Sequence, residues 1–125
     1  MIKLNKIIKN ALKELGLKCY YCTRRNENEE CIVFNYSSTP KNFADNEQIG
    51  NSYVILINIY SCKNVEYYKK SVLKLMKKAG FKGGTVQNTL PCDNKVKDIK
   101  FFNTAITFKY YMSEENYLDL DEGAL

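Results

Sequence analysis

The sequence predicts an α+β fold, a two-layer sandwich in which two helices pack on one face of a mixed or antiparallel sheet. Two segments carry apolar residues at helical spacing, and five carry the alternation or dense apolar character of strands, in the order α-β-β-β-α-β-β. The 125 residues, 45% of them apolar, suit one domain with one core. We expect this domain to span residues 1–112 and to be followed by an acidic C-terminal tail, 113–125.

The first helix is predicted from apolar residues spaced three and four apart with lysines between them, and Gly16 is a suitable stop. Its apolar positions are Leu4, Ile7, Ile8, Ala11, Leu12 and Leu15. Cys19–Thr23 has the character of a short strand, Arg24–Glu30 of a charged turn, and Cys31–Ser37 of a second strand.

Between the second and third strands we expect a loop over Ser38–Gly50, long enough to need a functional reason. The third strand, Tyr53–Ser61, is apolar on both of its faces. That pattern predicts a central strand that is covered on both sides, or one with a face against another subunit.

The second helix is predicted over Val65–Ala79, with Asn64 as its cap, Gly80 at its stop and lysines opposite its apolar stripe. The alternating segments Thr85–Leu90 and Ile99–Met112 then predict two strands around a turn.

The net charge of +5 is unevenly distributed along the chain. All 19 Lys and Arg residues precede Ser113, in a segment with nine acidic residues, whereas the last thirteen residues hold five acidic residues and no basic one. A basic body with an acidic tail predicts charge-complementary docking, within the chain or between copies. The alternative is a solvated surface with a frayed terminus.

The chain is poor in groups that carry catalysis. It has no histidine, and Cys19-x-x-Cys22 with Cys31 falls short of a zinc site because residues three apart on a strand point to opposite faces. An odd count of five cysteines favours free thiols over a disulfide framework. We therefore predict no catalytic residue, no metal site, no cofactor and no enzymatic activity.

Nucleic-acid binding is an open alternative for a basic chain with ten Tyr and six Phe. Most of these aromatic residues fall at strand positions, where core packing explains them. No apolar run approaches the roughly 20 residues that span a bilayer, and the N-terminus has no signal-peptide pattern, so we expect no membrane contact.

A succession of short motifs runs from Ile2 to Met112. They are Lys13-Glu14-Leu15-Gly16, Ile32-Val33-Phe34-Asn35-Tyr36, Pro40, Phe43-Ala44-Asp45-Asn46-Glu47, Ile57-Asn58-Ile59-Tyr60-Ser61, Leu75-Met76-Lys77-Lys78-Ala79-Gly80-Phe81 and Phe108-Lys109-Tyr110-Tyr111. This succession resembles the small tail-terminator, or tail-completion, proteins of long-tailed phages and prophages of low-GC Gram-positive bacteria. The acidic tail from Ser113 lies outside the resemblance.

The resemblance implies a non-enzymatic structural protein of the virion, assembled in the bacterial host cytoplasm. Such a protein forms a ring, typically a hexamer, that ends the tail tube and binds head-completion or neck proteins while DNA passes through without specific binding. A lumen that passes DNA should not hold phosphates tightly, so either the lysine-rich helix faces outward or the acidic tail screens it. The candidate subunit-interface residues are Phe43, Asp45, Asn46, Glu47 and Tyr53. The alternatives are another neck or head-completion component, or a nucleic-acid-binding accessory protein.

Overall fold

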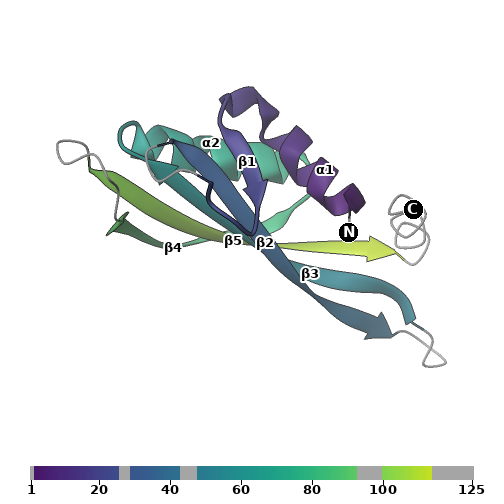
Figure 1. The fold of residues 1–125 in the computed structure, drawn as a ribbon. Helices are drawn as coiled ribbons and strands as arrows, with labels where there is room; N and C mark the ends of the chain where they lie inside the picture. The colour runs from purple at the N-terminus through teal and green to yellow at the C-terminus, as the bar shows by residue number, and fades with distance from the viewer. Residues whose placement is uncertain (1, 26–28, 43–47, 93–99, 114–125) are drawn as a thin grey trace.

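The computed structural model describes residues 2–25, 29–42, 48–92 and 100–113 (Figure 1). Its helices and strands follow the predicted order α-β-β-β-α-β-β, with one short 3-10 helix, η1, after the first helix. The elements are α1 (Ile2–Ala11), η1 (Lys13–Leu15), β1 (Lys18–Tyr21), β2 (Cys31–Asn42), β3 (Gln48–Ser61), α2 (Val65–Lys78), β4 (Lys82–Cys92) and β5 (Phe101–Ser113).

The five strands form one mixed sheet in the order β1-β2-β3-β5-β4. β1 runs parallel to β2, and the other neighbouring pairs are antiparallel. Figure 1 shows α1 and α2 on the same side of this sheet. The predicted α+β sandwich with two helices on one face is therefore confirmed.

The core lies between the helices and the side of the sheet that faces them. α1 contributes Leu4 and Ile8, Leu12 follows directly after α1, and α2 contributes Val72 and Met76, all fully buried. They pack against inward-facing residues of β2, β3 and β5. These are Ile32, Phe34, Tyr53, Ile55, Ile57, Ile59, Ile106, Phe108 and Met112. The alternation of β3 thus has a physical cause, because every second residue of a strand points to the same face.

The predicted stop at Gly16 agrees with the structure, whereas the predicted cap at Asn64 does not. Gly16 follows η1 with a φ of 75°, a left-handed conformation that glycine adopts at low cost. Asn64 lies at the N-cap of α2, but its side chain makes no capping hydrogen bond, so the predicted side-chain cap is wrong. The Glu30 carboxylate instead accepts hydrogen bonds from the backbone N–H groups of Cys62 (3.1 Å) and Lys63 (3.4 Å). A distant residue, located just before β2, therefore holds the entry to this helix.

The segment predicted as a loop, Ser38–Gly50, is mostly strand. β2 continues to Asn42 and β3 begins at Gln48, with Thr39 opposite Ser52 and Lys41 opposite Gly50. The small polar residues here lack the apolar alternation that marks a strand in sequence, yet the backbone pairing does not require it. Pro40 is tolerated because β1 ends at Tyr21, which leaves this part of β2 at an edge of the described sheet.

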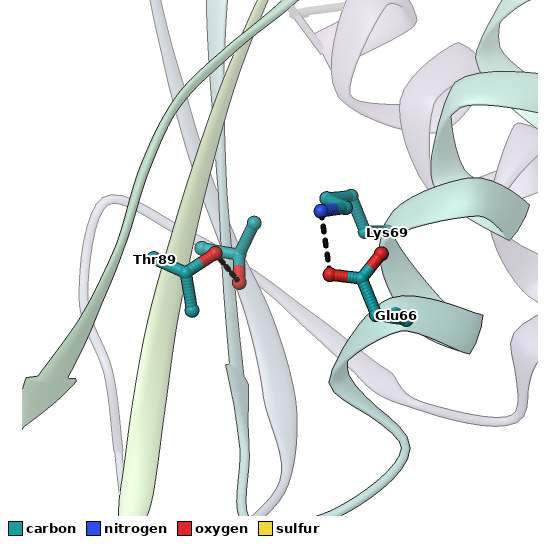
Figure 2. Close-up of polar contacts among 4 residues, drawn as sticks. Glu66, Lys69 and Thr89 are labelled. Atoms are coloured by element: carbon teal, nitrogen blue, oxygen red, sulfur yellow. Dashed lines mark hydrogen bonds and ion pairs between the residues drawn. The ribbon is translucent and has the colours of Figure 1, made fainter.

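β4 is also longer than predicted, because it begins at Lys82 and continues to Cys92, whereas β5 (Phe101–Ser113) keeps nearly the predicted bounds and Ile99 lies outside the described residues. Figure 2 shows two polar contacts, one between these strands and one along α2. The Thr89 and Thr104 hydroxyls lie 3.1 Å apart and join β4 to β5 on the helix side of the sheet. The Lys69 ammonium and Glu66 carboxylate, 2.7 Å apart, lie along α2 one turn from each other.

Candidate functional site: the open face and edges of the sheet

The side of the sheet away from the helices, here called the open face, is only partly covered. On β3 it carries Val54, Leu56, Asn58 and Tyr60, and Val54 is 46% exposed. The expectation that β3 is covered on both sides is therefore wrong at this position in the single chain. The other expectation, that one face of β3 meets another subunit, stays a prediction.

One end of the open face is covered by Arg24, from the segment after β1. The guanidinium carbon lies 4.2 Å from the centre of the Tyr60 ring and 5.5 Å from that of Phe101. Its Nη1 donates a hydrogen bond to Cys92 Sγ at 4.0 Å. The Arg24 side chain therefore also contacts the end of β4. Under this cover Cys31 is fully buried, and burial raises the pKa of its thiol.

The other end of the open face lies along an extended part of the hairpin, here called the arm: residues 37–42 of β2 and 48–54 of β3. In Figure 1 the end of the arm projects away from the two helices. The strand β5 pairs along β3 as far as Gly50, opposite Ser113. A Cβ added to Gly50 would collide with the carbonyl oxygen of Met112 and the Tyr111 ring, so this close approach of strands requires glycine.

The outermost strand β4 is the longest open edge in the described part of the chain. Nine of its eleven residues are exposed, among them the apolar Val86 and Leu90. No charged residue occurs between Gly83 and Cys92. Proteins commonly protect such edges with charges or a covering segment, so a long, exposed and uncharged edge is a natural place for another strand to pair.

A cleft of about 560 Å³, here called the lysine cleft, lies where β4 begins beside β5. Its lining residues are Thr39, Ser52, Tyr53, Val54, Gly80, Lys82, Lys109, Tyr110 and Tyr111. Tyr111 and Val54 supply exposed apolar surface, and the two lysines supply positive charge. This cleft is not apparent in the sequence, because its two lysines are 27 positions apart and only the β4–β5 register brings them together.

Of the five residues predicted at a subunit interface, four lie outside the described residues: Phe43, Asp45, Asn46 and Glu47. The fifth, Tyr53, is fully buried in the chain, where its ring meets that of Tyr36 edge-on at 5.8 Å. It also lines the lysine cleft. The interface role of all five stays a prediction.

The cysteines are spread over the sheet. The thiol of Cys19 is packed against the core on the helix side, and its burial raises the pKa to about 11. Cys22, three residues on, is exposed. Within residues 2–25, 29–42, 48–92 and 100–113, no cluster of three or more His, Cys, Asp or Glu side chains is arranged to hold a metal ion.

No helix in the described part of the chain is long and apolar enough to span a membrane. Comparison with models of known protein families found no match, and neither did comparison with curated proteins.

Proposed function

We propose that this protein is a non-enzymatic structural subunit of a phage or phage-like tail. In this proposal, copies of the chain form a ring, typically a hexamer, that terminates the tail tube and joins it to the head or neck. The observation that carries the proposal is the pair of unequal open edges at opposite sides of the sheet. The succession of short sequence motifs, which resembles that of tail-terminator proteins, is the reason for proposing a phage tail as the assembly.

The two open edges belong to different strands and have different shapes. On one side, β2 extends past the end of β1, so its residues 37–42 present an edge in the described sheet. On the other side, β4 presents an edge of eleven residues. A contact between unlike edges is heterologous, and a heterologous contact repeated around an axis closes into a ring. Pairing between edges would also satisfy the backbone groups that both edges leave exposed.

The open face is consistent with the same proposal. Val54, Tyr111 and Leu90 are 46%, 44% and 55% exposed on this side of the sheet. Exposed apolar residues on neighbouring strands are favourable at a subunit contact, where their surface is removed from water.

Light scattering coupled to size-exclusion chromatography tests the proposal. We expect the purified chain, alone at high concentration or mixed with tail tubes of its own phage or prophage, to give a ring whose mass is six times that of the chain. Electron microscopy of the mixture should show the ring at one end of each tube. A chain that stays monomeric at every concentration and never binds tubes would contradict the proposal.

Substitutions at the β4 edge make the test specific. Leu90→Lys places a charge on the exposed edge, and we expect it to abolish ring formation because charged edge residues block strand pairing. The matched control is Tyr67→Lys, which introduces the same charge at an exposed aromatic residue of α2. If both variants form rings as the unmodified chain does, β4 is not the subunit contact.

A further inference from the structure

The lysine cleft contains two like charges that face each other directly. Lys82 of β4 is opposite Lys109 of β5 in the strand register, so the two side chains share one face of the sheet. Like charges at such a position destabilise the strand pair unless an anion lies near them. The ion pairs between described residues are Lys18–Glu29 and Lys69–Glu66, and neither involves the lysines of the cleft.

Beside the lysines, the cleft has apolar surface as well as the polar residues Thr39 and Ser52. Val54 and Tyr111 are roughly half exposed on the same face as the lysines, whereas the Tyr110 ring lies toward the helices and stacks on the buried Phe81 with 4.4 Å between centroids. A tyrosine ring and a valine next to two ammonium groups suit a ligand that carries both carboxylates and apolar side chains.

The backbone at the cleft can also receive an extended segment. β4 begins at Lys82, opposite Lys109, so residues 110–113 of β5 have no strand beside them on that side within the described sheet. An added strand there would continue the line of β4 and form main-chain hydrogen bonds with β5, the usual geometry of strand addition.

The chain itself carries a segment of this chemistry directly after β5. Residues 114–122 contain five carboxylates, three apolar residues and no base. Their last part, Leu118-Asp119-Leu120-Asp121, alternates apolar and acidic residues. This alternation has the period of a strand, with leucines on one face and carboxylates on the other.

We infer that the acidic tail of this chain docks in its own lysine cleft, as an added strand along the end of β5. The segment after β5 begins at residue 114, five residues after Lys109, so a short reversal of the chain brings it back beside β5. So short a connection gives the tail a high effective concentration at its own cleft. Its carboxylates then neutralise Lys82 and Lys109, and its leucines contact Tyr111 and Val54. The docking does not depend on the ring proposed above.

Proteolysis of the full chain tests this inference. We use a protease that cleaves after glutamate, and mass spectrometry measures the rate of cleavage after Glu115. The variant Lys82→Glu/Lys109→Glu should be cleaved there about tenfold faster than the unmodified chain, because it repels the tail. The matched control Lys70→Glu/Lys74→Glu changes two exposed lysines of α2 and should keep the slow rate. Adding 0.5 M salt should speed cleavage of the unmodified chain, because exposed charges are screened within about 4–5 Å at that strength.

Charge exchange provides the specific check. Adding Asp119→Lys and Asp121→Lys to the Lys82→Glu/Lys109→Glu variant restores the charge complementarity and should restore slow cleavage after Glu115. Equal cleavage rates in the unmodified chain and the lysine variant would overturn the inference. Protection that rises with protein concentration would also overturn it, because the tail would then occupy another copy.

A second measurement does not rely on altering the cleft. Amide chemical shifts are compared between the unmodified chain and a chain whose five tail carboxylates are changed to amides. We expect shifts at Lys82, Lys109 and Tyr111 and none along α2. Unchanged shifts at the cleft would overturn the inference, whatever the proteolysis shows.

Discussion

The two faces of β3 carry similar residue types and reach opposite outcomes. Ile55, Ile57 and Ile59 face the helices and are almost completely buried, whereas Val54, adjacent in sequence, is 46% exposed. Both sets are β-branched or apolar and suit a strand equally well. The difference therefore comes from which segments return over each face, and it shows that apolar character alone does not identify the covered side of a sheet.

The open face repeats this contrast between its two ends. At the Tyr60 end, Arg24 lies over the rings and Cys31 is buried. At the Val54 end, the lysine cleft lies open between the described residues. Arg24, from the segment after β1, thus lies over one end of the face and not over the other. The open end keeps the cleft that the tail-docking proposal uses.

Truncating one residue on each face of β3 gives the largest effect. We expect Ile55→Ala to lower the free energy of unfolding by about 2–5 kcal/mol, because it leaves a cavity between the sheet and the helices. Val54→Ala should cost less than about 1 kcal/mol, because half of that side chain is already in water. Urea unfolding followed by circular dichroism measures both.

The two substitutions also check the assembly. They are compared at a concentration where the chain is monomeric, since a ring would bury Val54 and stabilise the folded state by mass action. Equal losses for both variants in the monomer would mean that the open face is covered in solution, and the contrast between the faces would then be wrong.

Much of the fold is predictable because it follows from periodicity. The stripe on α1, the alternation of Ile55, Ile57 and Ile59, and the glycine at the end of η1 all mark their elements in the sequence. The extension of β2 to Asn42 is not marked in this way. Its residues are small and polar, and their strand conformation comes from pairing with β3, which the local sequence does not encode.

The intermediate effect concerns the cover at the Tyr60 end. We expect Arg24→Ala to lower the free energy of unfolding by about 0.5–2 kcal/mol, because it removes a cation held over two aromatic rings. Arg25→Ala is the matched control. Arg25 is exposed and lies 5.2 Å from one ring, that of Tyr20, so its loss should cost about 0.5 kcal/mol or less.

Thiol reactivity separates loss of cover from loss of charge. Cys31 is fully buried beside Arg24, so it should react slowly with a thiol reagent in the unmodified chain and faster in the Arg24→Ala variant. Mass spectrometry of the labelled peptide identifies the cysteine. Slow labelling of Cys31 in both variants would mean that Arg24 does not close this end of the face.

The candidate site was less accessible to sequence reasoning than the fold. Lys82 and Lys109 meet only because β4 pairs with β5, and Arg24 reaches Cys92 from 68 positions away. One signal was present, namely the ten uncharged residues from Gly83 to Cys92 in a chain rich in lysine. Such a run is typical of an edge that pairs with something, although it does not identify the partner.

The smallest effect is a pH dependence on the helix side of β1. Burial is the main reason that the Cys19 pKa rises from an ordinary 9.0 to about 11, and the neighbouring Lys9 opposes the rise. The folded chain then keeps this proton up to about pH 11, while the unfolded chain loses it near pH 9. The contribution of Cys19 to stability is therefore complete below pH 9 and lost as the pH rises from 9 through 11.

The variant Cys19→Ala isolates this contribution from the lysines and tyrosines that titrate in the same range. We expect the free energy of unfolding to fall less steeply between pH 9 and 11 in the variant than in the unmodified chain, and to run parallel below pH 8.5. Urea unfolding at each pH measures both curves. Parallel curves through pH 11 would mean that the Cys19 thiol is in contact with water, and β1 would then be as open on its helix side as Val54 is on the open face.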